Sequence, residues 1–284
     1  MGRKTAATRP LPGESVTVRD GMRLYSEVAR RALQRQLAYR TENLAGLVTN
    51  IFFGYLRAAV LLAVYAATTN VGGYDAQAAV TYAWITQAMI MIVALWGWWD
   101  IELTIRTGDV ISDLSKPFSY VGFWLAREMG RAAYFVVFRA VPVLLAGQVM
   151  FGLHWPSSPG AWLAAGVSIL LAVVVSFGWR FLLNVSAFWT TDARGLGMVA
   201  NAAVMFLGGF VVPIRYFPDW LQPVVLALPF ASIIQTPADL FVERIQGSAV
   251  PALLVGQLAW AAVLLGLAQL TTLLATRRVV IQGG

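Results

Sequence analysis

Six stretches of this chain are apolar over about the length that a helix needs to cross a lipid bilayer. A helix rises about 1.5 Å per residue, so roughly 20 residues cross a hydrocarbon layer of about 30 Å. The stretches cover residues 47–68, 78–98, 128–153, 162–183, 198–212 and 250–276, and none of them contains a lysine. The fifth is short, whereas the third and sixth are long enough to tilt. This pattern predicts an all-α polytopic membrane protein with six transmembrane helices.

The residues before the first apolar stretch divide into two parts. Residues 1–20 hold several charges together with Pro10, Pro12 and Gly13, and they lack the apolar core of a signal peptide. We expect a disordered cytoplasmic tail there. In residues 21–46, apolar residues recur at helical spacing, and charged residues, mostly arginines, lie between them. This predicts an amphipathic helix on the inner membrane surface, although a helix packed on a soluble partner would show the same pattern.

The last connection between apolar stretches has an unusual composition. Residues 213–247 contain five prolines beside Trp220, Leu221 and Phe230. The segment is too apolar for a free loop and too interrupted for a span. Because non-helical backbone at membrane depth must be shielded by protein, we expect a re-entrant hairpin of short helices that dips into the outer leaflet.

Positive charge is distributed unevenly around the apolar stretches. Hydrophobic residues make up 58% of the 284 residues and charged residues 12%, with a formal net charge of +7. With the N-terminus inside, Arg215 and Arg244 are the only basic residues between spans on the outer side. Because basic residues favour the cytoplasmic side, we place both termini in the cytoplasm. The charge thus reflects membrane orientation, and no basic groove with stacking aromatics suggests nucleic-acid binding.

Several kinds of chemistry are excluded by the residues that the chain lacks. It has no cysteine and a single histidine, His154, so we predict no metal site. Its two lysines, Lys4 and Lys116, lie outside any Gly-x-x-x-x-Gly-Lys-Ser/Thr pattern, which holds phosphates in ATPases. We therefore expect no catalytic residue, no cofactor and no ATP hydrolysis on this chain.

The polar segment 100–118, between the second and third spans, is the most informative connection. The residues after Gly108 have the length of a short helix, with Asp109 near its positive end and Lys116 in its last turn. Pro117 would stop this helix. A compact charged helix of this kind can dock into a groove of a cytoplasmic partner, although an ordinary solvated loop can have the same composition.

Two motifs in the chain resemble those of one protein family. The first combines Arg106-Thr107-Gly108-Asp109 with Leu114-Ser115-Lys116-Pro117. The second runs from Gly208-Gly209-Phe210 through Pro213, Pro218 and Trp220-Leu221 to Leu228-Pro229-Phe230 and Gln235-Thr236-Pro237. Both are similar to motifs of the type-2 exporter permeases, the membrane subunits of ATP-binding-cassette (ABC) transporters, in a bacterial six-span branch. The resemblance extends over residues 21–280.

This resemblance implies a half-transporter for an amphipathic substrate such as a lipid-linked molecule, a natural product or a drug. Two permease subunits, identical or paralogous, would form a path through a bacterial plasma membrane. Two separate ATPase subunits would bind ATP and Mg²⁺. Residues 21–46 would be the connecting or elbow helix. The residues assigned to ATPase coupling are Arg106, Gly108, Asp109, Ser112, Asp113, Leu114, Lys116 and Pro117, and those assigned to an outer gate are Phe210, Pro213, Phe217 and Phe230.

Arginines within the apolar stretches are the second clue to function. A central arginine costs about 2.5–3.5 kcal/mol even on an insertion scale, so Arg57, Arg139 and Arg180 should each face protein or water. We expect no mid-span carboxylate to neutralise them, although Glu128 could pair with Arg127 or Arg131 near the inner end. They would attract an acidic cargo or bond to backbone carbonyls. The residues assigned to the translocation path are Asn50, Arg57, Gln87, Met91, Arg139, Asn201 and Met205.

Two other classes of membrane protein share much of this pattern. A secondary transporter or channel works without an ATPase, but it normally carries a buried Asp or Glu for ion coupling, or inverted repeats, and the sequence indicates neither. A structural scaffold would form no cavity that alternates between the two sides. The sequence therefore favours a permease subunit, with a secondary transporter or channel as the main alternative.

Overall fold

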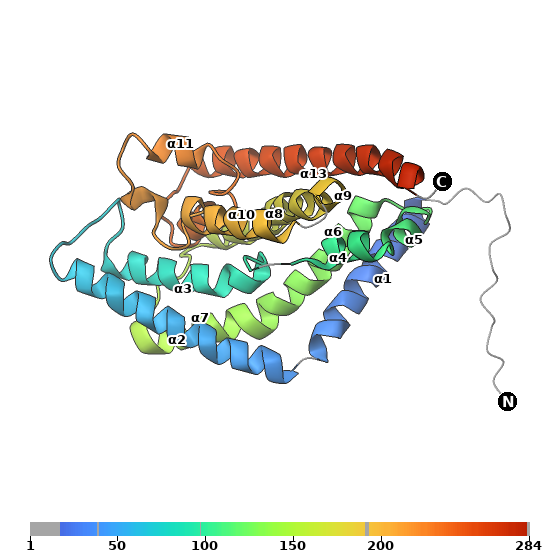
Figure 1. Cartoon of the computed structure of the whole chain (residues 1–284). Helices are drawn as coiled ribbons and strands as arrows, with labels where there is room; N and C mark the ends of the chain where they lie inside the picture. Colours follow the sequence, from blue (N-terminus) through green and yellow to red (C-terminus); the bar gives the residue numbers. More distant parts are fainter. Residues whose placement is uncertain (1–17, 39, 97, 191–192, 283–284) are drawn as a thin grey trace, which may run out of the picture.

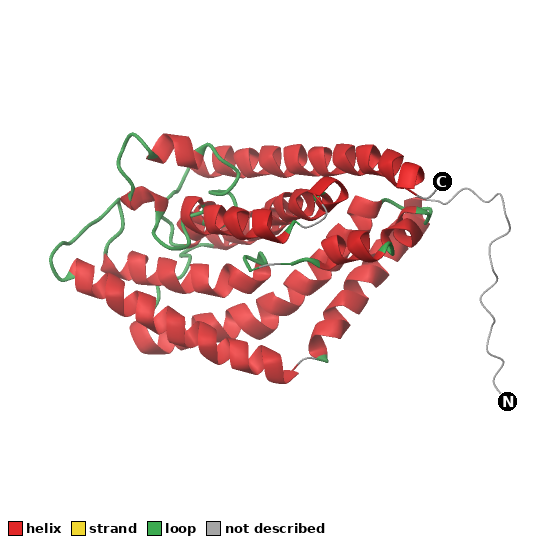
Figure 2. Cartoon of the chain, in the orientation of Figure 1, coloured by secondary structure: helices red, strands yellow, loops and turns green. Residues whose placement is uncertain are grey.

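The computed structural model describes residues 18–282 with gaps at 39, 97 and 191–192, and this part of the chain is helical without a named strand (Figures 1 and 2). The helices are α1 Val18–Leu37, α2 Arg40–Tyr65, α3 Ala76–Ile92, α4 Asp100–Thr107, α5 Val110–Leu114, α6 Tyr120–Phe135, the π-helix η1 Val136–Ala140, α7 Val141–Phe151, α8 Pro159–Val185, α9 Ala187–Thr190, α10 Arg194–Leu207, the 3-10 turn η2 Ile214–Tyr216, α11 Gln222–Leu226, α12 Gln235–Phe241 and α13 Ala249–Gln282. The all-α prediction is confirmed for these residues. The predicted tail lies outside them except for its last three residues, which begin α1.

Four helical segments are long and apolar enough to cross a membrane, namely Thr41–Tyr65, Tyr120–Phe151, Pro159–Thr190 and Ala249–Thr276. They correspond to the predicted first, third, fourth and sixth spans. The second and fifth are shorter than predicted, since α3 has 17 residues and α10 has 14. In Figure 1, α3 and α10 nevertheless run alongside the long helices. The start of α1, the α4–α5 segment and the end of α13 lie at one end of this bundle.

The amphipathic N-terminal helix packs against the protein along α6. It ends at Leu37, and α2 begins at Arg40, so residues 41–46 extend the first long helix rather than α1. Gly130 of α6 lies against the α1 backbone, where a Cβ atom would be 2.6 Å from the carbonyl carbon of Ala29. This close approach fixes α1 against the bundle, and its place at the membrane surface remains a prediction.

Helix α3 lies at the centre of the core. Nearly every residue from Ala79 to Ile92 is buried, so it shows no polar face. Trp84 fits between Gly54 of α2 and Gly147 of α7, where Cβ atoms would lie 3.0 Å and 2.5 Å from its ring. Small residues allow helices in membranes to approach closely. The glycines therefore fix how α2 and α7 pack on α3.

The end of α3 differs from the prediction that its span continues to Trp98. The helix ends at Ile92, and Ala94 has a positive φ of 48° in the turn that follows. The carbonyl groups of Met91 and Ile92 accept hydrogen bonds from the Arg131 guanidinium, and that of Val93 accepts one from the Ser176 hydroxyl. Because donors from other helices satisfy these carbonyls, the helix can end in an apolar region.

The proline-rich segment 213–247 folds into η2, α11 and α12, as short helices joined by turns. Residues 230–242, including α12, are buried, and α12 packs against α8 and α3. Its backbone is thus shielded by protein, as expected of non-helical chain at membrane depth. The depth of this segment in the membrane remains a prediction.

A π-helical turn interrupts the third long helix. Residues Val136–Ala140 form η1, directly before Pro142 in the first turn of α7. Proline has no N–H group, so it cannot donate to the preceding turn of an α-helix. The backbone widens there, and π-helical turns of this kind often occur at functional sites. Arg139 lies within this turn.

Candidate functional site

Most residues predicted to line the translocation path surround one cavity, which we name the α2–α3 cavity. Its volume is about 440 Å³, and Asn50, Arg57, Gln87, Met91 and Arg139 all line it. Phe210, predicted as part of the outer gate, also lines it, together with apolar Phe53, Ile90 and Trp96. The cavity therefore combines two guanidinium groups with mostly apolar walls.

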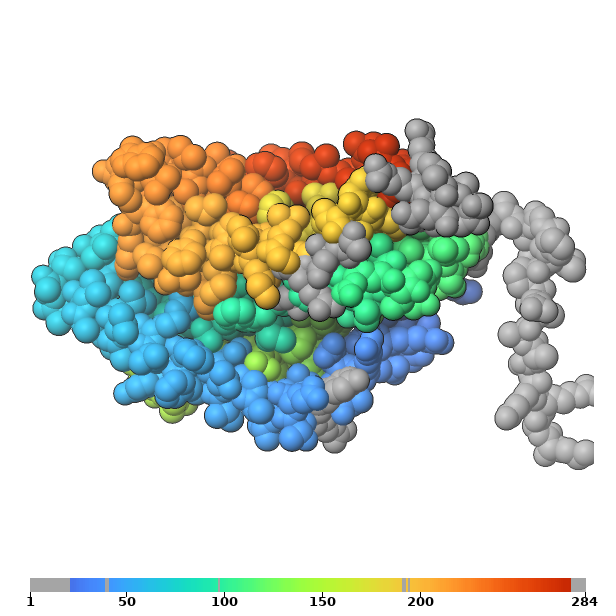
Figure 3. Space-filling model, viewed as in Figure 1, coloured from blue at the N-terminus to red at the C-terminus, as the bar shows by residue number. Residues whose placement is uncertain are grey.

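Two predicted path residues, Asn201 and Met205, lie on α10 outside the lining of this cavity. Both are half-buried. In Figure 3, α10 and α2 are both exposed on the face that is shown. The structure thus brings five of the seven predicted residues together around the α2–α3 cavity and leaves these two beside it.

Arg57 is held mainly by backbone and neutral side chains. Its guanidinium donates to the Phe210 carbonyl, to the Thr86 hydroxyl at 3.1 Å and to the Gln87 amide oxygen at 3.4 Å. It also lies 4.4 Å from the centroid of the Phe210 ring, a cation–π distance. The Tyr82 hydroxyl donates to the Gly209 carbonyl at 2.7 Å. Together, Arg57 and Tyr82 supply hydrogen-bond donors to the backbone carbonyls that follow the end of α10.

Arg139 is less exposed than Arg57 and less well bonded. Its side chain donates to the Asn43 carbonyl at 3.2 Å and to the Asn50 amide oxygen at 3.4 Å. Its Nε and the Nδ2 of Asn50 are buried without a hydrogen-bond partner in the structure. Gly46 of α2 leaves room for the guanidinium, because a Cβ atom there would lie 2.8 Å from Arg139 Cζ.

A second cavity adjoins the first where α1, α2 and α6 meet, and we name it the α1–α6 cavity. Its volume is about 460 Å³. Four arginines and three carboxylates line it, namely Arg35, Arg127, Arg131, Arg139, Glu42, Asp100 and Glu128. Gly46, Met91 and Arg139 line both cavities. Arg139 therefore stands where a polar cavity meets a mainly apolar one.

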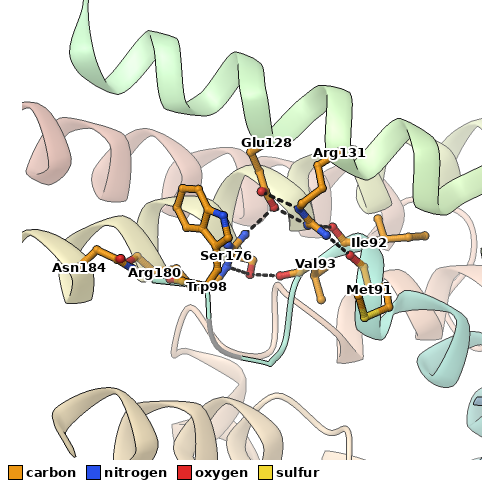
Figure 4. Close-up of polar contacts among 9 residues, drawn as sticks. All are labelled: Met91, Ile92, Val93, Trp98, Glu128, Arg131, Ser176, Arg180 and Asn184. Atoms are coloured by element: carbon orange, nitrogen blue, oxygen red, sulfur yellow. Dashed lines mark hydrogen bonds and ion pairs between the residues drawn. The ribbon is translucent and has the colours of Figure 1, made fainter. Parts of the chain in front are cut away.

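For Arg180, Glu128 corrects the expectation that no carboxylate neutralises the arginines within the spans. Its carboxylate accepts from Arg131 Nε at 2.8 Å, from Arg131 Nη2 at 2.6 Å and from Arg180 Nη2 at 2.6 Å (Figure 4). The side chains are almost fully buried, with relative exposures of 1% for Glu128, 8% for Arg131 and 4% for Arg180. Arg131 is the predicted partner of Glu128, whereas Arg127 pairs with Asp100 instead. The pairing with Arg180 on α8 was missed because it joins two helices.

A second buried carboxylate lies near the opposite end of the bundle and was also missed. Asp239 of α12 accepts hydrogen bonds from the Tyr74 hydroxyl and from Gln235 at 3.0 Å, and it lies 3.6 Å from Arg244. Burial raises the pKa of Asp239 above its ordinary value of 3.8, although the bonds from Tyr74 and Gln235 act in the opposite direction. The sequence predicts that this segment is shielded by protein, but it does not indicate that the acidic Asp239, two residues after Pro237 in the same short helix, is among the buried residues.

The predicted coupling segment is a pair of short helices rather than a single one. Gly108 has a φ of 82°, a left-handed conformation that glycine adopts readily, and it separates α4 from α5. α5 ends at Leu114, so Lys116 follows the helix instead of lying in its last turn, and its ammonium pairs with Asp113 at 2.6 Å. The exposed residues among those assigned to coupling are Arg106, Gly108, Asp109, Ser112, Lys116 and Pro117, whereas Asp113 and Leu114 are half-buried.

The four residues predicted to form an outer gate do not gather at one place. Phe210 and Pro213 are buried near Arg57, and Phe210 covers its guanidinium. Phe217 packs in a small cluster around Ile214. Phe230 instead contacts Trp179 of α8, with ring centroids 5.0 Å apart. Their shared role in closure remains a prediction.

The fold and these cavities can be compared with known proteins. A model of the family described as ABC-2 family transporter protein matches residues 51–283, which is most of the chain. No curated protein and no solved structure matches the chain significantly. The match includes α3, the α4–α5 segment and the proline-rich hairpin, and it begins within α2. The chain belongs to the ABC-2 family of transporter proteins, whose members are membrane components of ABC transporters.

Proposed function

We propose that this chain is the permease subunit of an ABC exporter that moves an amphipathic substrate out across a bacterial plasma membrane. Two permease subunits, identical or paralogous, enclose the path, and two ATPase subunits bind ATP and Mg²⁺ on the cytoplasmic side. Six helical passes cross the bilayer, with α3 and α10 as the short ones, and both termini are cytoplasmic. Family membership over residues 51–283 is the observation that carries this proposal.

The surface of the α4–α5 segment supports a role in contacting the ATPase. Leu103 and Ile111 are 53% and 56% exposed, and they lie among the charged residues of the segment. Exposed apolar side chains rimmed by polar ones are typical of interaction sites. The segment lies at the same end of the bundle as the start of α1 and the end of α13 (Figure 1). This is the arrangement expected if that end faces the cytoplasm.

The interior contacts of the same segment support its role as a transmitter of force. Ile101 of α4 and Val110 of α5 are buried in one cluster with Trp124 of α6 and Phe181 of α8. Because packed side chains resist compression, a push on the exposed face would move α6 and α8 together. In this proposal, closure of the ATPases shifts these helices and reshapes the α2–α3 cavity toward outward release, while the proline-rich hairpin closes the outer end.

The experiment is to purify the chain with its ATPase, reconstitute the complex and measure ATP turnover. Asp109→Asn combined with Lys116→Gln should lower the permease-dependent ATP turnover several-fold while insertion and folding persist. Asp219→Asn is the matched control, because Asp219 is exposed in the hairpin segment, away from α4 and α5. Unchanged turnover in the double variant would refute the assignment of the α4–α5 segment to coupling.

The buried Asp239 favours a second candidate, a secondary transporter that uses an ion gradient. The sequence indicated no buried carboxylate of this kind, and the structure contains one with a raised pKa. Against this candidate, Asp239 is already engaged by Tyr74, Gln235 and Arg244. Vesicles that contain this chain alone distinguish the two, because uphill transport driven by a proton gradient without ATPase would establish the second candidate and exclude the first.

A further inference from the structure

We propose that Arg139 recognises the acidic group of an amphipathic cargo, a carboxylate or phosphate carried on an apolar body, in the α2–α3 cavity. This inference names the cargo class for the path proposed above and therefore rests on that proposal. Three independent features of the site carry it, namely the bonding of Arg139, its position between two cavities, and the apolar walls around it.

The bonding of Arg139 is incomplete for a buried charge. The residue is 6% exposed, and no carboxylate of the described residues forms an ion pair with it. Its two acceptors are neutral oxygens at 3.2 Å and 3.4 Å. Its Nε and the neighbouring Asn50 Nδ2 are buried donors without an acceptor. Buried polar groups are nearly always paired, so these N–H groups indicate an acceptor that the protein itself does not supply.

The other buried or partly buried arginines of the region have a carboxylate partner or no buried N–H group without an acceptor, although Nη1 of Arg180 is also buried without a partner. Arg131 and Arg180 share the Glu128 carboxylate. Arg127 pairs with Asp100. Arg57 is held by the Phe210 carbonyl and ring. Arg139 therefore differs from these neighbours in combining a buried N–H group without an acceptor with the lack of a carboxylate partner among the described residues.

The position of Arg139 suits a residue that meets cargo on its way into the path. It lines both the α1–α6 cavity and the α2–α3 cavity. It lies on the π-helical turn η1, a feature that often marks functional positions. An acidic group that enters through the polar α1–α6 cavity would reach Arg139 before the apolar cavity beyond it.

The α2–α3 cavity suits the apolar part of such a cargo. Phe53, Ile90, Trp96 and Phe210 line it, and its volume of about 440 Å³ lies in the range of roughly 300–1,000 Å³ typical of small-molecule sites. Arg57 on the same lining adds positive charge without a carboxylate partner among the described residues. An anion with an apolar chain would thus find both of its parts matched, whereas a cation would be repelled.

The test measures ligand binding to the full chain in phosphatidylcholine nanodiscs. The ATPase is absent, so the outcome is independent of the ATP-turnover experiment described under the proposed function. The ligand is a brominated alkyl phosphate, because bromine quenches the emission of nearby tryptophans. The part of the quenching that disappears in Trp96→Phe comes from Trp96 and therefore reports binding in the α2–α3 cavity. Arg139→Gln should weaken alkyl phosphate binding by about ten- to a hundredfold, as expected for a lost charged hydrogen bond. The brominated alcohol of the same chain length should bind equally to both proteins.

Two further variants separate recognition from general effects. Gly46→Ala keeps the charge but displaces the guanidinium, so it should also weaken alkyl phosphate binding, and it decides the question if Arg139→Gln does not fold. Arg23→Gln removes an exposed charge of α1 and should change nothing. Unchanged phosphate affinity, or equal weakening for phosphate and alcohol, would overturn the role of Arg139. If inorganic phosphate alone competes for the site as well as the alkyl phosphate does, the proposal that the cargo carries an apolar body is wrong.

Discussion

Replacement of Glu128 by glutamine tests whether the buried ion cluster holds the bundle together. The Glu128 carboxylate accepts three hydrogen bonds from Arg131 and Arg180, and it is 1% exposed. Glutamine keeps the shape but leaves two buried guanidinium groups without a counter-charge, so the cluster changes from a net charge of +1 to +2. Breaking a buried pair from one side costs about 3–5 kcal/mol. Since 1 kcal/mol shifts the unfolding midpoint by about 2–4 °C in chains of roughly 150–250 residues, we expect a fall of about 6–20 °C.

The assay is thermal unfolding of the purified protein in detergent, followed by tryptophan emission. Arg180→Gln is the matched control, because it leaves both bonds between Glu128 and Arg131 in place and brings the cluster to a net charge of zero. We therefore expect Arg180→Gln to lower the midpoint less than Glu128→Gln does. The reasoning is wrong if Arg180→Gln is the more damaging of the two.

The double variant Glu128→Gln/Arg180→Gln sharpens this test. It restores a net cluster charge of +1, so it should be more stable than the sum of the two single losses predicts. Independent sites add to within about 0.3–0.5 kcal/mol, whereas residues in one network show larger coupling. Additive losses would show that the stability of this region does not depend on the pairing of Glu128 with Arg180.

Two further predictions concern packing and pH. Gly147→Ala should destabilise the protein by about 1–3 kcal/mol, because the new Cβ would lie 2.5 Å from the Trp84 ring in a filled core, whereas Gly256→Ala, with open space around it, should leave the thermal midpoint almost unchanged. Burial raises the pKa of Asp239 above 3.8, so ionisation of this carboxyl destabilises the folded state. The thermal unfolding midpoint of the native protein, measured relative to that of Asp239→Asn, should therefore fall as the pH rises from about 4 through the raised pKa. A constant difference in midpoint between the native protein and Asp239→Asn across this pH range would show that the pKa of Asp239 is not raised.

The positions of the long helices could be predicted from the sequence, because a continuous apolar stretch depends only on neighbouring residues. The ends of the short helices could not. The helix α3 ends at Ile92 because Arg131, 39 positions later, donates to its carbonyl. The apolar pattern continues past this point to Trp98, so composition alone places the end of the stretch too late. Helix ends that depend on a distant donor are invisible to local pattern analysis.

The candidate site shows the same division between local and distant information. The sequence assigned Asn50, Arg57 and Arg139 to the translocation path, and the structure places all three around one cavity. The separation of the arginines into neutralised and unneutralised ones required the tertiary structure, because Glu128 reaches Arg180 across 52 positions of the chain. The sequence alone left the same two alternatives open for all three arginines within the spans, attraction of an acidic cargo or bonding to backbone carbonyls, and the structure indicates that their roles differ.

The physical reason for these different roles lies in how short helices end inside a membrane. In the proposed six-pass arrangement, α3 and α10 are too short to carry all of their terminal carbonyls to water, and an unsatisfied carbonyl in hydrocarbon costs several kcal/mol. Arg131 satisfies the end of α3, and Arg57 satisfies the Phe210 carbonyl after the end of α10. Each of these guanidiniums therefore has a structural task that an isolated long helix would not need. Among the described residues, Arg139 bonds to the Asn43 carbonyl and the Asn50 amide oxygen of α2, a helix that is long enough to span the bilayer and needs no such cap. Its charge remains available to a ligand.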